Sequence, residues 1–192
     1  MPIGPPAGPA RLPPGLSIEL RRGDITAQPD LDAIVNAANA ALLPGGGVAG
    51  AIHRAAGPDL ADECRPLAPI RPGEAVLTAG HALPNRFVIH CLGPVYGEDE
   101  PAAELLAACY RNALALAGAH AIARIGFPAI STGIFGYPME EAAAVAFDAI
   151  LAPGAAPPGL TLIRFVLFDA AALSVHLAAL RARLAPDSPA GK

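Results

Sequence analysis

Hydrophobic residues gather in six short stretches along the chain, and some of these are almost uninterrupted. Residues 87–91 and 162–168 are nearly continuous apolar runs. A short run of this kind predicts a strand that is covered on both faces of a sheet. The six predicted strands are Ser17–Arg21, Ala33–Asn36, Ala75–Thr78, Phe87–Cys91, Arg124–Ala129 and Leu160–Phe168.

Between these stretches, apolar residues recur every three or four positions, which is typical of amphipathic helices. Pro101–Ala117 and Ala170–Leu184 show this spacing, and Pro138–Leu151 begins with a proline and two glutamates that suit the positive end of a helix. The first helix is expected to bury one stripe, made of Leu105, Cys109, Ala113 and Leu116. Helices that alternate with buried strands predict an α/β layered domain.

A glycine-rich loop follows the second predicted strand. The strand ends at Asn36, Gly45, Gly46 and Gly47 follow, and a helix is predicted to start near Val48. Successive glycines and the free N–H groups of a helix start form an anion site that suits phosphate or diphosphate. The segment also matches the dinucleotide pattern G-x-G-x-x-G. A Rossmann unit places that pattern directly after its strand, whereas eight residues intervene here.

Two more loops have similar chemistry. Ser131–Gly136 lies between a predicted strand and the helix from Pro138, and it would present further free N–H groups. Two such loops at neighbouring strand ends would clamp one diphosphate from both sides. In Gly23-Asp24-Ile25-Thr26, Asp24 is a candidate acceptor for a ligand amino group, and capping of the local turn is the alternative.

Composition narrows the class of protein. The 192 residues are 53% hydrophobic, and the net charge of −4 argues against an electrostatic nucleic-acid binder. Residues 1–16 hold six prolines and three glycines, so a disordered tail is expected there, followed by one domain over 17–184 and a flexible tail over 185–192. Neither a signal peptide nor a membrane span is recognisable, which predicts a soluble cytoplasmic protein. A compact domain of this size is expected to be a monomer.

The cysteines and histidines do not show metal-ligand spacing. Cys64, Cys91 and Cys109 lie far apart, which favours free thiols over a disulfide scaffold or a zinc site, so no metal or cofactor is expected. His90 is expected to be a satisfied core histidine, because it lies on an apolar strand. A catalytic pair with Cys91 is not expected, because adjacent side chains of a strand point to opposite faces.

Six ordered motifs resemble those of macrodomains, most closely the MacroD-type O-acetyl-ADP-ribose deacetylases and mono-ADP-ribosyl hydrolases. The resemblance covers about residues 17–184, and the motifs begin at Gly23, Ala33, Gly45, Ile52, Val88 and Phe127. It implies a three-layer α/β/α domain with a mixed, mostly parallel central sheet. It also implies ADP-ribose, ADP-ribosylated proteins or O-acetyl-ADP-ribose as ligands, with nucleic acid only as an ADP-ribosylated end.

The resemblance also assigns roles to residues. Asp24 and the Ile25 backbone would bind adenine beside Phe168, and Asn39 would hold the distal ribose with Asn36 alongside. The diphosphate would lie between two loops, and Phe135 would pack near the distal ribose. The loop residues are Gly45, Gly46, Gly47, Val48 and Ala49 on one side and Ser131, Thr132, Gly133, Ile134 and Phe135 on the other.

One departure concerns the chemistry. MacroD-type hydrolases usually carry an Asp where this chain has Ala49, and a methyl group cannot take a proton. Macrodomains of several RNA viruses have the same Gly-Gly-Gly-Val-Ala-Gly segment and are similar to proteins that still hydrolyse mono-ADP-ribose. The sequence therefore predicts either a hydrolase without this base or an ADP-ribose reader. His53, one helical turn after Ala49, either orients the site or plays a structural role.

Overall fold

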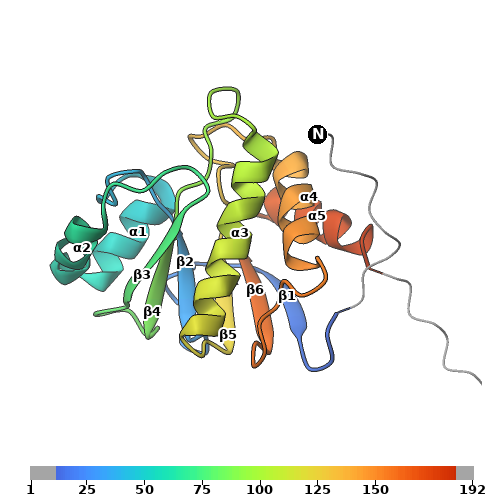
Figure 1. Cartoon of the computed structure of the whole chain (residues 1–192), viewed down its shortest axis with the longest axis horizontal. Coiled ribbons are helices and arrows are strands. Elements are labelled where there is room, and N and C mark those ends of the chain that lie inside the picture. Colours follow the sequence, from blue (N-terminus) through green and yellow to red (C-terminus); the bar gives the residue numbers. More distant parts are fainter. Residues whose placement is uncertain (1–11, 185–192) are drawn as a thin grey trace, which may run out of the picture.

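The computed structural model describes residues 12–184, which form a six-stranded sheet between two layers of helices (Figure 1). The sheet order is β1-β6-β5-β2-β4-β3, and only the β3–β4 pair is antiparallel. The predicted mixed, mostly parallel sheet is therefore confirmed. The strands are β1 (Ser17–Arg22), β2 (Ala33–Ala37), β3 (Ala75–Ala79), β4 (Phe87–Cys91), β5 (Arg124–Phe127) and β6 (Leu162–Leu167).

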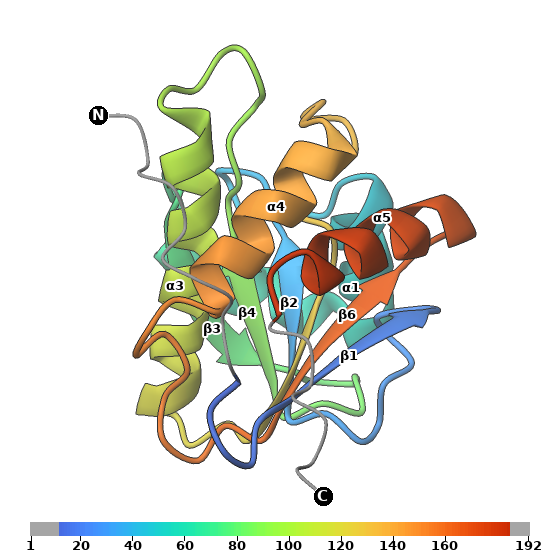
Figure 2. The same cartoon turned by 90° about the vertical axis from the view of Figure 1, so that its right-hand side faces the viewer.

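The helices cover both faces of the sheet, which confirms the three-layer prediction (Figures 1 and 2). The helix-rich face carries α3 (Ala102–Ala119), α4 (Met139–Ile150) and α5 (Ala170–Arg181), and the other face carries α1 (Gly47–Ala56) and α2 (Pro58–Cys64). Successive residues of β6 alternate between the two hydrophobic clusters: Phe165 belongs to the cluster that contains α3–α5, and Val166 belongs to the cluster on the face of α1 and α2. Every residue of β6 is buried, which explains its continuous apolar run.

Several boundaries differ from the predicted ones. In the predicted stripe of α3, Cys109 and Ala113 are fully buried as expected, whereas Leu105 and Leu116 are only half-buried. Leu106 and Leu114 are fully buried in their place. The short helix α2 and the 3-10 turn Arg65–Leu67 were not predicted as elements. Leu16, assigned to the N-terminal tail, is buried against the core, and its N–H group donates to the Pro13 carbonyl at 3.1 Å. Residues 1–11 and 185–192 of the predicted tails lie outside the described residues.

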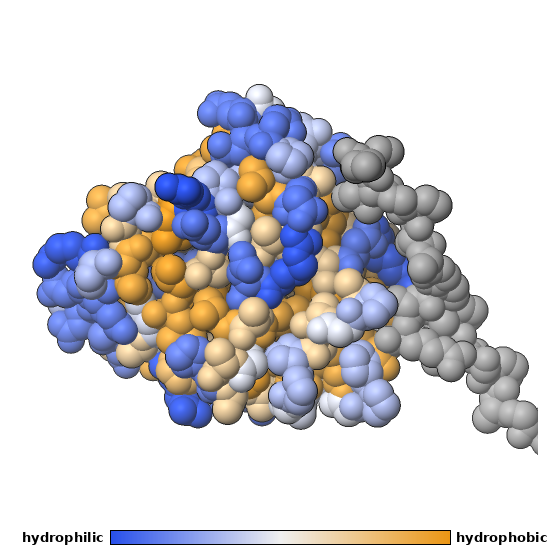
Figure 3. Space-filling model, in the orientation of Figure 1, coloured by the Kyte–Doolittle hydropathy of each residue, from blue (hydrophilic) through white to orange (hydrophobic). Residues whose placement is uncertain are grey.

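The surface is polar where solvent reaches the ends of the elements. Hydrophilic side chains gather over α2 and over the loop that follows β4, at the left and the top of Figure 3.

Cys64, Cys91 and Cys109 are buried and free of disulfides. Within residues 12–184, no helix combines the length and the apolar character needed to cross a bilayer.

Candidate functional site

A cleft of about 230 Å³ opens at the carboxyl ends of β2, β4 and β5. After β2 the chain turns to α1 on one face of the sheet, whereas after β5 it turns to α4 on the other face. Parallel sheets bind ligands at such a switch point, because the two diverging connections leave a crevice between them. The cleft is lined by residues 37–39, 45–49, 93, 129–131 and 133–135. The structure thus brings together the two loops that the sequence predicted to face each other.

The first wall of the cleft is the glycine loop and the start of α1. Gly46 is the N-cap, it provides no side-chain cap, and the first turn of α1 contains no acidic residue. The first backbone hydrogen bond of the helix runs from the Gly50 N–H to the Gly46 carbonyl at 3.2 Å. The N–H groups of residues 47–49 are therefore free of intrahelical partners, and the positive end of the helix dipole is not neutralised. This wall suits an anion.

The second wall is the loop that follows β5. Among the described residues, the backbone N–H groups of Gly133, Ile134 and Phe135 have no hydrogen-bond partner. Ser131 has a left-handed φ of 66°, and its hydroxyl is buried without a partner. An added Cβ at Gly93 would lie 2.1 Å from the Ser131 hydroxyl, so only glycine allows this approach. The buried, unpaired Ser131 hydroxyl in a left-handed conformation, next to three free N–H groups at the cleft, indicates a ligand site.

The side chains of the cleft are uncharged. Asn39 and Ala49 both line it, and none of the lining residues has an ionisable side chain. Asn39 also anchors the glycine loop, because its amide donates to the Leu43 carbonyl at 2.7 Å and accepts from the Leu43 N–H at 3.1 Å. The cleft therefore offers amide and backbone hydrogen bonds but no acid or base of its own.

His53 and Asn36 lie behind the cleft rather than in its lining. His53 is 6% exposed, both of its ring nitrogens lack a partner, and burial lowers its pKa. Asn36 is 1% exposed, and its amide nitrogen lies 3.1 Å from Nδ1 of His90. Nε2 of His90 lies 2.9 Å from the Thr78 hydroxyl, so His90 is a satisfied core histidine as expected, and burial lowers its pKa to about 3. Asn36 is thus directed into the core and away from the expected ribose site.

The expected adenine residues lie outside the cleft, at the neighbouring ends of β1 and β6. The Gly23 N–H donates to the Leu167 carbonyl at 3.0 Å, which brings the turn at Asp24 next to Phe168. Phe168 is 93% exposed, whereas Ile25 is buried beneath the turn. Asp24 caps this turn by accepting from the N–H and hydroxyl groups of Thr26 at 2.8 and 2.7 Å.

Sequence reasoning missed some of the cleft. Gly93, Ala37, Ala38 and Ile130 line it but were not predicted as site residues, whereas Thr132 was predicted and does not line it. The position of Gly93 two residues after a predicted strand was the available signal. Within residues 12–184, no group of three or more His, Cys, Asp and Glu side chains could hold a metal ion.

Comparisons with known proteins agree with this geometry. The sequence profile of the macro domain family, described as "Macro domain", matches residues 35–146. The chain is 49% identical to macro domain-containing protein CT2219 of Chlorobaculum tepidum over 172 residues, 89% of this chain and 99% of that protein. A solved structure of the Oceanobacillus iheyensis macrodomain with ADP has a TM-score of 0.84 and 40% identity, covering 90% of this chain and 94% of that one. The Trypanosoma brucei macrodomain in complex with ADP-ribose has a TM-score of 0.75 and 40% identity, covering 85% and 68%.

Proposed function

Because the chain belongs to the macro domain family, we propose that its cleft binds ADP-ribose and hydrolyses conjugates of that ligand. The reactions are removal of mono-ADP-ribose from acidic side chains and deacetylation of O-acetyl-ADP-ribose, as in MacroD-type enzymes. The observation that carries the proposal is the pair of facing loops whose backbone N–H groups have no partner. The ligands of the two similar macrodomains, ADP and ADP-ribose, support the same assignment.

The cleft is large enough for only part of ADP-ribose. Its volume of about 230 Å³ is below the range of about 300–1,000 Å³ for pockets that enclose a whole drug-sized ligand. We therefore assign the diphosphate and the distal ribose to the cleft, with Asn39 and Phe135 beside the ribose. The adenine would lie outside, between Asp24 and the exposed ring of Phe168.

Hydrolysis in this cleft would rely on positioning. A water molecule would attack the anomeric carbon of a mono-ADP-ribosylated acidic side chain, and the bond to the carboxylate oxygen would break to release the side-chain carboxylate. In O-acetyl-ADP-ribose the water would attack the acetyl carbonyl carbon, and the bond to the ribose oxygen would break to release acetate. In both reactions the ligand phosphate would orient the water in place of the missing carboxylate at Ala49, and the proton that the water loses would pass to the leaving oxygen or to solvent. Holding the diphosphate and ribose in register with the water replaces a bimolecular encounter by a bound geometry. His53 acts on this centre only through α1, because its ring lies behind the lining.

The second candidate function is a reader that binds ADP-ribose without cleaving it. Ala49 favours this function, because the cleft lining contains no group that could accept a proton. The two candidates share the ligand and differ only in turnover.

The decisive experiment measures release of free ADP-ribose from a protein carrying glutamate-linked mono-ADP-ribose, and of acetate from O-acetyl-ADP-ribose. The native chain is compared with Asn39→Ala, and ADP-ribose affinity is measured in parallel. A matched control is Leu43→Ala, since this side chain is 56% exposed and its bonds to Asn39 use only the backbone. Release that Asn39→Ala abolishes and Leu43→Ala retains supports the hydrolase. Binding without release supports the reader, and absence of binding by the native chain rejects both functions.

A further inference from the structure

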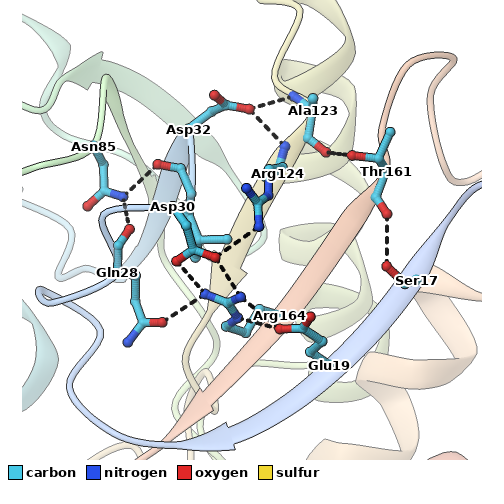
Figure 4. Close-up of polar contacts among 11 residues, drawn as sticks. Ser17, Glu19, Gln28, Asp30, Asp32, Asn85, Ala123, Arg124, Thr161 and Arg164 are labelled. Carbon is cyan, nitrogen blue, oxygen red and sulfur yellow. Dashed lines mark hydrogen bonds and ion pairs between the residues drawn. The ribbon is translucent and has the colours of Figure 1, made fainter.

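A buried arginine lies on β6, on the sheet face that carries α1 and α2. Arg164 is only 2% exposed, and it holds two carboxylates: Nε donates to Glu19 on β1 at 2.8 Å, and the two terminal nitrogens donate to Asp30 at 2.8 and 2.7 Å (Figure 4). The hydrogen bonds from Arg164 lower the pKa of Asp30 to about 2. One carboxylate would balance the charge of the guanidinium, and two are present.

Arg164 makes one more contact, which charge balance does not require. A terminal nitrogen donates to the side-chain carbonyl of Gln28 at 3.0 Å (Figure 4). Because a guanidinium only donates, the amide oxygen of Gln28 must face Arg164 and its nitrogen must point away. That nitrogen donates to the main-chain carbonyl of Asp24 at 2.7 Å. The result is a directed chain from β6 to the turn at Asp24.

The same segment is held from a second side. The Asn85 side chain, between β3 and β4, donates to the main-chain carbonyls of Gln28 and Leu31, each at 2.8 Å (Figure 4). Gln28 is 4% exposed and uses its side-chain oxygen, side-chain nitrogen and main-chain carbonyl in these contacts. The residue is therefore a fully bonded link rather than a surface glutamine.

The contacts of the Asp24 carboxylate set its direction. Within residues 12–184, its hydrogen bonds are the two from Thr26, and both go to Oδ1. The main-chain carbonyl of Asp24 accepts from the Gln28 side chain and, at 3.2 Å, from the Ala27 N–H. Because Oδ1 is held by Thr26, Oδ2 remains available at an exposed position next to Phe168. An acceptor fixed in this way can distinguish an amino group from a carbonyl oxygen on a base.

We propose that Gln28 and Arg164 are positioning residues for purine recognition: the chain Arg164–Gln28–Asp24 aims the Asp24 carboxylate at the exocyclic amino group of adenine. This inference rests on the proposed function, because it requires the adenine of ADP-ribose to lie at Asp24. It adds that selectivity for the base is set by residues which do not touch it.

The test compares two ligands, ADP-ribose and its hypoxanthine counterpart, which has an oxygen in place of the amino group. Isothermal titration gives both affinities for the native chain, Gln28→Glu and Gln28→Met. Gln28→Glu keeps an oxygen facing Arg164, replaces the donor to Asp24 by an acceptor and adds a negative charge. Gln28→Met removes both side-chain hydrogen bonds without adding a charge, so the two variants together separate loss of the donor from the effect of charge. The matched control is Arg124→Gln, which removes the 2.9 Å contact of Arg124 with Asp30 and leaves the chain through Gln28 intact.

The native chain should bind ADP-ribose at least about tenfold more tightly than the hypoxanthine ligand, as expected for a hydrogen bond to a charged group. Gln28→Glu and Gln28→Met should reduce this ratio several-fold, and Arg124→Gln should keep it. A general loss of stability would weaken both ligands together and leave the ratio unchanged.

Three results overturn the inference and separate it from the proposed function. If Gln28→Glu keeps the native ratio of the two affinities, Gln28 does not direct Asp24. If Arg124→Gln reduces this ratio as much as the Gln28 variants do, the effect is a general loosening of the cluster. Equal affinity of the native chain for both ligands shows that Asp24 does not distinguish the base, although ADP-ribose binding stands. If the native chain binds neither ligand, the proposed function fails as well.

Discussion

The packing of α1 against the glycine loop can be tested by adding one methyl group at Gly50. Gly50 is buried in α1, and a Cβ added there would lie 2.1 Å from the carbonyl oxygen of Gly45 and 3.2 Å from its carbonyl carbon. Gly46, the N-cap four residues upstream of Gly50, has an ordinary φ of −82° and would place a Cβ in open space. Gly50→Ala and Gly46→Ala therefore differ in one steric contact.

The expected cost follows from that contact. To relieve it, the loop or the helix must move by about 1 Å, because backbone atoms cannot rotate away as a side chain can. Overpacking costs about 1–3 kcal/mol, and a 2.1 Å approach to a backbone oxygen belongs to the upper part of that range, about 2–3 kcal/mol. The better helix propensity of alanine offsets about 1 kcal/mol of this cost. We expect the free energy of unfolding to fall by about 1–2 kcal/mol in Gly50→Ala.

The effect on binding should be larger than the effect on stability. A displacement of about 1 Å lengthens hydrogen bonds from the loop N–H groups to phosphate beyond their useful range. Loss of two such charge-assisted bonds, at about 1.5 kcal/mol each, predicts an affinity for ADP-ribose lower by about a hundredfold.

Urea unfolding followed by circular dichroism gives the stabilities of both variants, and isothermal titration gives the affinity of the folded Gly50→Ala protein. Gly46→Ala serves as the stability control, with an unfolding free energy within about 0.5 kcal/mol of the native chain. Equal stabilities of the two variants, or native affinity in Gly50→Ala, would refute the steric argument.

Two further predictions concern ionisable groups. Ala49→Asp places a carboxylate in the cleft, one turn before the unpaired ring of His53. We expect this carboxylate to raise the pKa of His53. We also expect it to increase the rate of ADP-ribose release by about a hundredfold, the low end of general-base catalysis. A single-turnover pH profile measures both effects, and unchanged or slower release would contradict the view that the cleft lacks a base. The hydrogen bond from Arg164 is the main cause that lowers the pKa of Asp30 from 3.8 to about 2. The ionised Asp30 therefore stabilises the fold above pH 3.8, and this stabilisation is lost as the pH falls through about 2. Acid unfolding should therefore steepen between about pH 4 and pH 2, and a profile for Asp30→Asn that matches the native one would count against this ion pair.

Local pattern was sufficient for much of the fold. The apolar run over β6, interrupted only by Arg164, predicted a strand buried on both faces. The alternation of such strands with helices predicted the layered class, because strands covered on both faces need apolar residues at nearly every position. The stripe of α3 was misplaced in part, since neighbouring leucines satisfy the same period equally well. Leu16 was assigned to the tail because proline and glycine precede it, whereas its packing depends on the core that it meets.

The candidate site shows the same division. Sequence by itself determined that two loops rich in small residues follow strands, that Ala49 stands where a carboxylate is usual, and that Asp24 begins a turn. Only the tertiary structure decided that the two loops face each other across one cleft, that Asn36 turns into the core towards His90, and that Gly93 lines the cleft. It also decided that Arg164, in the middle of an apolar strand, is linked through Gln28 to Asp24 over 136 and 4 positions of sequence. Backbone propensity and hydrophobic period act over a few residues, whereas side-chain direction and the satisfaction of buried polar groups depend on neighbours that only the folded chain supplies.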